Sequence, residues 1–333
     1  MKKYNIALVG VGAVGRELLK TLKRRNFPIE RLKVFARSSR EIKVDGKTYS
    51  VERISHEGFK DIEIALFAGT EGEKGASVTY APAAVKEGAV VIDNGQDFRL
   101  KEDVPLIIPE INAEDIKHHK GIISNPNCST IQMVLAIYPI YKLGGIKRII
   151  VSTYQAASGA GQKAQDELFN QTREFLENKR LTIKEFPKRI AFNVFPQIGS
   201  FGEFGYTSEE WKMVKETQKI LHDKKIKITS TTVRVPVKTG HSQAIYLETK
   251  RPLPLDKIRG ALDRQPGIKV VDDVENQDYP VPCQCEGKDE VFVGRIRKDP
   301  FVENGLWLWV VSDNLLKGAA LNAVQIAELL VKG

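Results

Sequence analysis

The segment Gly10-Val11-Gly12-Ala13-Val14-Gly15 constrains the fold of this chain more than any other. It follows the apolar run Ile6 to Val9, which predicts a strand, and it leads into Val14 to Arg24, which predicts a helix. In that context glycines permit a tight turn and let backbone N–H groups approach a pyrophosphate at the helix N-terminus. The six residues therefore predict a dinucleotide-binding turn. A turn that serves only packing is the alternative.

The next segments alternate between strand-like and helical patterns, which predicts a Rossmann-type, doubly wound parallel sheet. Its further strands are expected at Leu32–Ala36, Ile62–Ala68, Val90–Asp93 and Gly121–Ser124. The apolar, alanine-rich segment Asn314 to Leu330 has helical periodicity and needs to bury one face. We therefore expect a first domain of residues 1–127 with 312–333.

Residues 128–311 contain longer β-rich runs than the first domain, together with helical stretches. This pattern predicts an α+β second domain with a mixed sheet. A helix is expected to begin at Cys128, because apolar residues recur after it at helical spacing. The expected strands are Arg148–Tyr154, Ile226–Val237 and Ser242–Lys250, and the expected helices are Gly161–Asn178, Glu209–His222 and Asp256–Leu262. A chain of 333 residues is long enough for two such domains.

Charge and cysteine content narrow the possible partners. The 51 basic and 42 acidic residues give a net charge of +9, but the basic residues are scattered, which favours small anionic ligands over nucleic acid. No stretch approaches the roughly 20 apolar residues of a membrane span. Three cysteines do not suit a disulfide framework, and the lone pair Cys283 and Cys285 does not suit zinc. We expect a cytoplasmic protein without nucleic-acid, membrane or metal partners.

The end of the second expected strand indicates which dinucleotide is bound. An NAD site would place an acidic residue there for the ribose hydroxyls, but this chain has Arg37-Ser38-Ser39-Arg40. Arg37 and Ser38 suit a 2′-phosphate, which favours NADP. A solvated basic loop is the alternative.

Cys128 lies between a strand end and the start of an amphipathic helix, in Ser124-Asn125-Pro126-Asn127-Cys128. Peptide dipoles and unbonded N–H groups at a helix start stabilise a thiolate and so favour a nucleophile. A small buried hydrophobic residue fits this position equally well. The local sequence leaves both interpretations open.

Four separated motifs now occur in an order that resembles the aspartate-β-semialdehyde dehydrogenase family. They are Asn127 to Thr130, Tyr154 to Gly159, Arg234 with His241, and Val293 to Lys298. The resemblance covers nearly the whole chain. It implies NADPH-dependent reductive dephosphorylation of L-4-aspartyl phosphate to aspartate semialdehyde, an early step towards lysine, threonine, methionine and diaminopimelate. It also implies a homodimer in which the second domains pair.

The resemblance implies three catalytic side chains. Cys128 would carry the acyl group as a thioester, because a thiolate attacks an acyl phosphate readily. His241 would be the acid and base, since an imidazole titrates near neutrality. Gln155 would orient the substrate and the thioester. Without the resemblance, His241 would be a polar residue at a turn and Gln155 a turn filler.

Further side chains match binding positions of the family. Arg234 would bind the substrate carboxylate, because a guanidinium suits a carboxylate. Glu209 would bind the amine, and the ammonium of Lys212 would bind the phosphate. The other matching positions are Arg99 and Asn127 for the phosphate, and Ser158, Gly159 and Asn314 for the nicotinamide end of the cofactor. Taken alone, these residues would be ion pairs, solvated helix turns or helix caps.

Two other functions are compatible with parts of this sequence, and one loop differs from the family pattern. N-acetyl-γ-glutamyl-phosphate reductases usually follow their cysteine with tyrosine, whereas this chain has Ser129-Thr130 and the segment Gly294 to Lys298. A catalytically silent NADP-binding relative is disfavoured because Cys128 and His241 are both retained. The loop Gly69 to Gly75 is more charged than the serine-rich loop of the family, and no cofactor contact is assigned to it.

Overall fold

The computed structural model describes residues 2–332 and divides the chain into two compact units. The first unit contains the residues up to Asn127 and those from Ala319 onward, and the second unit is Cys128–Gly318. The expected boundary at residue 312 lies too early. Residues 312–318 belong to the second unit because the strand that ends at Ser312 pairs within it.

The first unit contains a seven-stranded sheet in the order β3-β4-β2-β1-β5-β6-β7. The strands are β1 (Tyr4–Val9), β2 (Ile29–Ala36), β3 (Arg40–Val44), β4 (Lys47–Arg53), β5 (Ile64–Phe67), β6 (Val90–Asp93) and β7 (Ile122–Ser124). All neighbouring strands are parallel except β3 and β4. The predicted doubly wound parallel sheet is confirmed, and the β3–β4 hairpin was not predicted.

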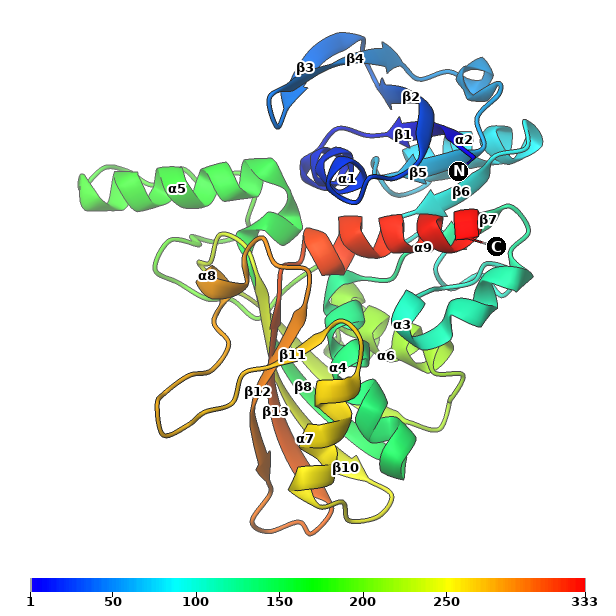
Figure 1. Cartoon of the computed structure of the whole chain (residues 1–333). Helices are drawn as coiled ribbons and strands as arrows, with labels where there is room; N and C mark the ends of the chain where they lie inside the picture. Colours follow the sequence, from blue (N-terminus) through cyan, green and yellow to red (C-terminus); the bar gives the residue numbers. More distant parts are fainter. Residues whose placement is uncertain (1, 333) are drawn as a thin grey trace. The chain divides into compact units, whose positions relative to one another are not determined.

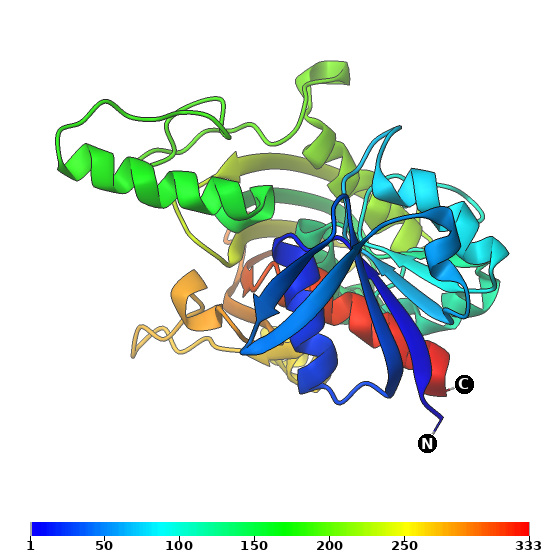
Figure 2. The same ribbon diagram turned by 90° about the horizontal axis from the view of Figure 1, so that it is seen from above.

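Helices cover both faces of this sheet, because alternate residues of its strands are apolar in both directions (Figure 2). Ile6 and Leu8 face the cluster that contains α1 (Ala13–Arg24) and α9 (Leu321–Lys332), and Ala7 and Val9 face the cluster that contains α2 (Ala76–Lys86). The short helices are η1 (His56–Phe59), α3 (Pro109–Asn112) and η2 (Ala113–His118).

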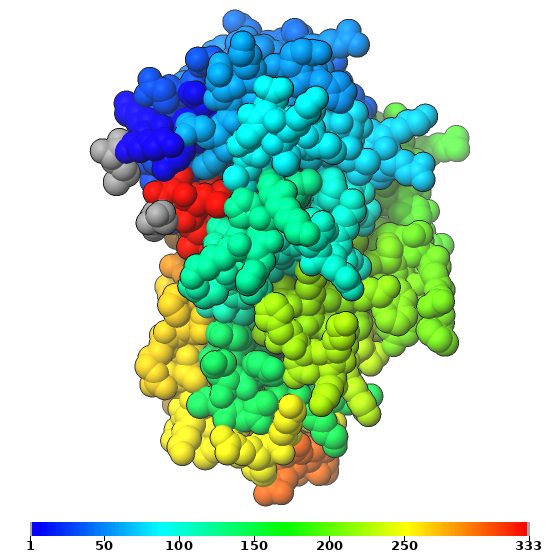
Figure 3. Space-filling view, turned by 90° about the vertical axis from the view of Figure 1, so that its right-hand side faces the viewer, coloured from blue at the N-terminus to red at the C-terminus, as the bar shows by residue number. Residues whose placement is uncertain are grey.

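Helix α9 packs on the first unit, as the sequence predicts. An ion pair joins α9 to a part of the chain that is distant in sequence. Arg25, just after α1, binds Glu328 of α9. In the space-filling view the red atoms of the C-terminal segment lie beside dark blue atoms of the N-terminal segment (Figure 3). The predicted helix Asn314 to Leu330 is not continuous. Leu316–Ala320 forms a separate π-helix before α9 begins at Leu321.

The second unit contains a six-stranded sheet in the order β11-β12-β13-β10-β8-β9 (Figure 1). The predicted mixed sheet is confirmed, and β11, β12 and β13 were not among the predicted strands. The strands are β8 (Ile146–Gln155), β9 (Lys227–Arg234), β10 (His241–Thr249), β11 (Ile268–Val270), β12 (Val291–Lys298) and β13 (Gly305–Ser312). The helices are α4 (Cys128–Gly144), η3 (Ala157–Ala160), α5 (Gln162–Leu176), η4 (Glu203–Gly205), α6 (Ser208–Ile220), α7 (Leu255–Arg264) and α8 (Pro282–Cys285). Between residues 2 and 332, no helix is both long and apolar enough to cross a membrane.

Candidate active site

Four strands of the second unit bring the predicted catalytic and binding residues to one edge of the sheet. Gln155 ends β8 and Arg234 ends β9, and the two residues are opposite each other in the parallel pair. His241 begins β10, which runs antiparallel to β8, and lies opposite Ser312 at the end of β13. Residues that are up to 86 positions apart in the chain, Gln155 and His241, therefore meet at one edge.

The start of α4 is fixed against the same edge. Cys128 is its first residue and is half-buried. Four residues later, Gln132 donates from Nε2 to the His241 carbonyl oxygen at 3.2 Å, and its Oε1 accepts from the Ser312 hydroxyl at 2.8 Å. Gly318 packs against Cys128, since a Cβ there would lie 2.8 Å from the Cys128 Cβ. The thiol is therefore held next to the strand ends.

One residue, Ala156, holds both His241 and Arg234 through its backbone N–H and its backbone carbonyl. Its N–H donates to His241 Nδ1 at 3.1 Å, and its carbonyl oxygen accepts from Arg234 Nη1 at 2.6 Å. Gly159 lies in front of both side chains: a Cβ there would be 2.9 Å from His241 Cε1 and 3.1 Å from Arg234 Nη1. A larger residue than glycine would displace one of them.

Burial determines the protonation of His241, which is completely inaccessible to solvent. Burial, and then the charge of Arg234, lower the pKa of His241 to about 3, while Glu209 acts in the opposite direction. Burial also lowers the pKa of Arg234, against the charges of Glu209 and Cys128. The imidazole is therefore neutral at physiological pH. This differs from the expected titration near neutrality because the ring is excluded from water.

Gln155, Glu209 and Lys212 form a connected group beside Arg234. Gln155 donates from Nε2 to Glu209 Oε1 at 3.2 Å, and Lys212 Nζ lies 3.3 Å from Glu209 Oε2. Glu209 is buried near the start of α6. A capping box formed by Thr207 and Glu210 fixes this end of the helix. A solvated helix turn does not describe this group, since Gln155 and Glu209 are both buried.

Ser158 and Asn314 contact each other in the second unit. Asn314 Oδ1 accepts from the Ser158 hydroxyl and from the Gly240 N–H, both at 3.0 Å. Asp313, rather than Asn314, acts as the cap. Its Oδ1 accepts from the backbone N–H groups of Leu315 and Leu316. Asn314 is thus fixed beside the turn that precedes His241.

Arg99 and Asn127 belong to the first unit, and both are buried. Arg99 donates from Nε to the Asn125 carbonyl at 2.9 Å and from Nη2 to the Asn94 carbonyl at 2.8 Å. Asn94 follows β6 and Asn125 follows β7, so Arg99 is held at the carboxyl edge of the sheet. Asn127 immediately precedes Cys128 in the chain.

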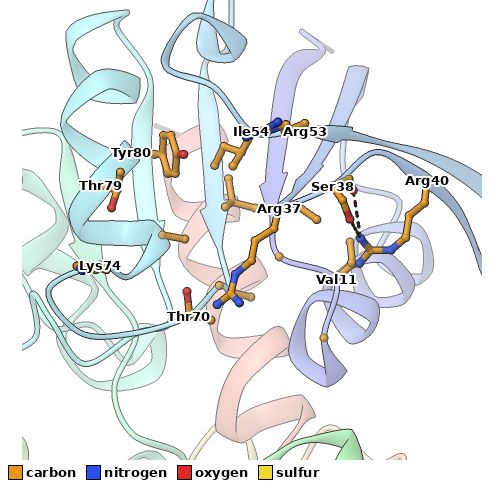
Figure 4. A pocket seen from close by; sticks show the side chains of 17 residues that line it. Val11, Arg37, Ser38, Arg40, Arg53, Ile54, Thr70, Lys74, Thr79 and Tyr80 are labelled. Atoms are coloured by element: carbon orange, nitrogen blue, oxygen red, sulfur yellow. Dashed lines mark hydrogen bonds between the residues drawn. The ribbon is translucent and has the colours of Figure 1, made fainter.

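A pocket of about 840 Å³ opens in the first unit at the same carboxyl edge, where doubly wound sheets bind ligands (Figure 4). The predicted residues that line it are Gly10, Val11, Gly12, Arg37 and Ser38. Ala13, Val14 and Gly15 are not among its lining residues, because α1 begins at Ala13. The pocket carries cations and no carboxylate, which fits an anionic ligand such as NADP.

The three glycines of the turn have different environments. Gly10 has a φ of +98°, and a Cβ there would lie 2.3 Å from the Ala68 carbonyl oxygen. A Cβ on Gly15 would lie 2.0 Å from the Gly10 carbonyl oxygen. Gly12 has nothing within 4 Å of such a Cβ. Gly10 and Gly15 are therefore required by packing, and Gly12 leaves room for a ligand.

The pocket also includes three cations to which the sequence gave no individual role: Arg40, which belongs to the basic segment after β2, and Arg53 and Lys74, which the sequence did not indicate. Arg40 donates from Nη1 to the carbonyl and hydroxyl of Ser38 and so stiffens the loop. Figure 4 shows Arg37 extending towards Thr70. Arg53 ends β4 opposite Ala36 of β2, so only the pairing of these strands would have revealed it. Lys74 lies in the charged loop to which no contact was assigned.

The other two cysteines, Cys283 and Cys285, are not placed as Cys128 is, at the start of a long helix beside His241 and Arg234. Cys285 is buried, and burial raises the pKa of its thiol to about 12, which makes a thiolate inaccessible near neutral pH. Cys283 is exposed in the same short helix. In the part of the chain that the structure describes, no group of three or more His, Cys, Asp or Glu residues is arranged to bind a metal ion.

Known proteins resemble this chain along its whole length. The family model described as semialdehyde dehydrogenase, NAD binding domain, matches residues 5–119, and the one described as semialdehyde dehydrogenase, dimerisation domain, matches residues 137–317. The aspartate-semialdehyde dehydrogenase of Aquifex aeolicus is 52% identical over 99% of this chain and 98% of its own length. That of Bacillus subtilis is 46% identical over 98% of this chain and 97% of its own length.

Solved structures agree with these relatives. The crystal structure of aspartate semialdehyde dehydrogenase II from Vibrio cholerae, complexed with ASA, has a TM-score of 0.95 and 44% sequence identity, and covers 100% of this chain and 99% of its own. A probable aspartate-semialdehyde dehydrogenase from Pseudomonas aeruginosa has a TM-score of 0.90 at 28% identity, over 99% of both chains. The chain therefore belongs to the aspartate-semialdehyde dehydrogenase family of NADP-dependent oxidoreductases.

Proposed function

We propose that this chain is an aspartate-semialdehyde dehydrogenase, which reduces L-4-aspartyl phosphate with NADPH to L-aspartate 4-semialdehyde and phosphate. The observation that carries the proposal is the thiol of Cys128 at the start of α4, held beside a strand edge with buried His241 and Arg234. The relatives from Aquifex aeolicus, Bacillus subtilis and Vibrio cholerae are aspartate-semialdehyde dehydrogenases, which supports the same substrate. The reaction would contribute to lysine, threonine, methionine and diaminopimelate biosynthesis.

In this proposal the first unit binds the cofactor. Gly10, Val11 and Gly12 would approach the pyrophosphate, and Ala13, Val14 and Gly15 would supply the start of α1 behind it. Arg37 and Ser38 would bind the 2′-phosphate, because a guanidinium and a hydroxyl donate to phosphate oxygens. Ser158, Gly159 and Asn314 of the second unit would contact the nicotinamide end. Bound NADPH would supply a hydride to the thioester carbon.

Cys128, Gln155 and His241 would act on the reacting acyl group. The Cys128 thiolate attacks the acyl carbon, a carbon–sulfur bond forms and phosphate leaves. A thioester accepts hydride more readily than a carboxylate does, which is the reason for the covalent step. Gln155, fixed by Glu209, would orient the acyl group, and His241 would interact with its oxygen.

The remaining polar side chains would bind the substrate. Arg234 uses one N–H on the Ala156 carbonyl and retains further donors of its fork for the substrate carboxylate. Glu209 would bind the amine, and Lys212 the phosphate. Arg99 and Asn127 would add phosphate contacts from the first unit. Apart from the neutral Asn127, each role places a charge opposite a group of the other sign.

We further propose a cytoplasmic homodimer paired through the second unit. Exposed apolar side chains support this pairing, because an exposed apolar surface of this kind often marks a protein interface. They occur on β8, on α5 and in the segment after α5: Ile150, Tyr154, Phe169, Phe175, Leu176 and Phe192. The match of residues 137–317 to a dimerisation domain points the same way.

The test is an assay in the reverse direction. Purified protein should form NADPH from NADP when aspartate semialdehyde and phosphate are present, and it should not do so with N-acetylglutamate semialdehyde. Omission of phosphate is the matched control, since phosphate has to cleave the thioester. Folded protein that turns over neither aldehyde would contradict the proposed function, and preference for the N-acetylated aldehyde would favour the alternative reductase.

A further inference from the structure

Three asparagine side chains form a chain of hydrogen bonds across the carboxyl ends of parallel strands in the first unit. Asn322, the second residue of α9, donates from Nδ2 to Asn125 Oδ1 at 2.7 Å. Asn125, after β7, donates from its own Nδ2 to Asn94 Oδ1 at 3.1 Å. Asn94, after β6, donates from Nδ2 to the carbonyl oxygen of Phe67, the last residue of β5, at 2.9 Å. The chain therefore runs from α9 across the ends of three neighbouring strands.

Backbone carbonyl groups fix the orientation of these amides at both ends of the chain. Because a carbonyl oxygen can only accept, the amide of Asn94 turns its Nδ2 to that carbonyl and its Oδ1 to Asn125. The Oδ1 atoms of Asn94 and Asn125 then each accept from the next amide. At the other end, Nδ2 of Asn322 also donates to the carbonyl oxygen of Ile107 at 2.9 Å.

Asn94 and Asn125 are also the two residues that hold the guanidinium of Arg99. Arg99 donates from Nη2 to the Asn94 carbonyl at 2.8 Å and from Nε to the Asn125 carbonyl at 2.9 Å. Bonds from two nitrogens of a rigid, planar guanidinium fix both its plane and its direction. The side-chain bond between Asn94 and Asn125 links the two residues that accept these bonds, so a shift of either one would move Arg99.

Apolar side chains already account for the packing of α9. Ala323, Val324 and Ile326 belong to the core of the first unit. Asn322 and Asn125 are also buried, and burial of an amide costs free energy that its hydrogen bonds offset. A bonded polar network of this kind contributes a defined geometry more than stability. The amide chain is therefore explained best by the group whose geometry it sets.

We propose that Asn322 is a positioning residue for phosphate binding: through Asn125 and Asn94 it holds the guanidinium of Arg99 in the orientation that receives the phosphate group. The inference rests on the proposed function for the phosphate role of Arg99. Asn322 itself would not touch the phosphate. The C-terminal helix would then determine how tightly phosphate binds, together with the loop after β6.

Steady-state kinetics in the reverse direction test this role, with phosphate varied at saturating aspartate semialdehyde and NADP. In Asn322→Ala the KM for phosphate should rise about tenfold, because displacement of a binding group by a distant substitution lowers its contribution. The KM for aspartate semialdehyde and the dissociation constant of NADP should stay within about twofold, since Asn322 does not line the cofactor pocket. An unchanged KM for phosphate would overturn the proposal.

Gln325→Ala is the matched control on the same helix. Gln325 donates from Nε2 to Glu110 of α3 at 2.9 Å, so this variant also removes a side-chain hydrogen bond of α9. Its KM for phosphate should stay within about twofold of that of the unmodified protein. A rise as large as in Asn322→Ala would show that any loosening of α9 has this effect, and it would overturn the specific role of Asn322.

Asn94→Ala breaks the same chain at its other end and covers the case in which Asn322→Ala does not fold. It keeps the backbone carbonyl that accepts from Arg99, but it removes the side chain that links Phe67 to Asn125. The KM for phosphate should again rise about tenfold. A KM equal to that of the unmodified protein would contradict the positioning of Arg99 by the amide chain.

A double-mutant cycle separates an action through Arg99 from a general structural effect. Arg99→Gln should raise the KM for phosphate by about tenfold or more, because it removes the charge that binds the anion. When Asn322→Ala is added to Arg99→Gln, that KM should change by less than about twofold, since the group that Asn322 positions is gone. Additive effects, or an unchanged KM in Arg99→Gln alone, would overturn the proposal.

Exchange of the Arg99 Nε–H with water gives a readout that needs no substrate. In protein with ¹⁵N-labelled arginine, its signal is assigned by its loss in Arg99→Gln. This buried N–H should exchange slowly in the unmodified protein and about tenfold faster or more in Asn322→Ala, but not in Gln325→Ala. Equal exchange in Asn322→Ala and the unmodified protein would overturn the proposal. Failure of the unmodified protein to turn over aspartate semialdehyde would contradict the proposed function but not the positioning of Arg99.

Discussion

The pocket of the first unit and the strand edge of the second unit both carry charged side chains, but the two regions hold them differently. Arg37, Arg53 and Lys74 are exposed, and their side chains have no hydrogen-bond or ion-pair partner among the described residues. In the second unit Arg234 and Glu209 are buried and bonded to neighbouring groups. One region offers cations to an incoming anion, and the other holds its groups in fixed positions.

The difference separates recognition from chemistry. Exposed cations retain their hydration and cost little stability, and they bind a multiply charged cofactor through many weak contacts. Buried groups cost stability, but they need no rearrangement when charge develops on a substrate. Variants in the two regions should therefore change different measured quantities.

The largest expected effect is on turnover and comes from Cys128→Ser. A serine hydroxyl is a much weaker nucleophile than a thiolate near neutral pH, so turnover should fall by about 1,000-fold or more. The dissociation constant of NADP should stay within about twofold, because the pocket lies in the first unit. Turnover is measured from NADPH absorbance, and binding by calorimetry. Normal turnover in this variant would show that no thioester forms on Cys128.

Acid pH should lower the stability of the second unit through His241. In the folded chain His241 stays neutral down to about pH 3, whereas in the unfolded chain it takes up a proton near pH 6.5. Its contribution is therefore complete above pH 6.5 and is lost as the pH falls towards 3, by about 2 kcal/mol between pH 7 and pH 5.

Urea unfolding at pH 7 and pH 5 measures this loss, and His241→Gln is the comparison because it has no titrating ring. His119, whose pKa is also lowered by burial, remains in both proteins and cancels in the difference. The same pH dependence in both proteins would show that His241 titrates normally in the folded chain.

Gly15→Ala and Gly12→Ala should separate packing from ligand binding within one turn. The new Cβ at Gly15 meets the Gly10 carbonyl at 2.0 Å, so the free energy of unfolding should fall by about 1–3 kcal/mol. The one at Gly12 meets no protein atom within 4 Å, so stability should be kept while NADP binds about tenfold more weakly, or 1.4 kcal/mol. Equal effects of the two variants on binding and stability would contradict these separate roles.

The smallest effect should come from Arg37→Glu in the cofactor pocket. A carboxylate there repels the 2′-phosphate, so NADP should bind about tenfold more weakly, and NAD, which lacks that phosphate, should change less. Arg31→Glu is the control, since Arg31 is exposed on β2 outside the pocket lining. An equal change for NADP and NAD would remove the 2′-phosphate role from Arg37.

Local patterns in the sequence predicted the parts of the molecule that depend on local physics. The glycine turn, α1 and the start of α4 at Cys128 follow from short spacings, and the structure has them at those residues. The edge shared by Gln155, Arg234 and His241 depends on the register of β8, β9 and β10, which no short segment encodes. Only the family resemblance brought these residues together.

The residues that sequence analysis missed have the same physical origin. Arg53 enters the pocket because β4 pairs with β2, and the β3–β4 hairpin was not predicted. Ala156 holds both His241 and Arg234 through its backbone N–H and carbonyl oxygen, and such backbone contacts do not depend on residue type. Backbone contacts and strand register are therefore the information that only the structure supplied.

The division of the chain also sets an order for folding during synthesis. The second unit is one continuous segment, Cys128–Gly318, whereas the core of the first unit includes Ala320, Ala323, Val324 and Ile326. A ribosome releases residues from the N-terminus onward, so the second unit can complete its core while the first still lacks α9. The nascent first unit would expose the face that α9 covers until residues 319–331 have emerged, so its core closes only after that of the second unit can close.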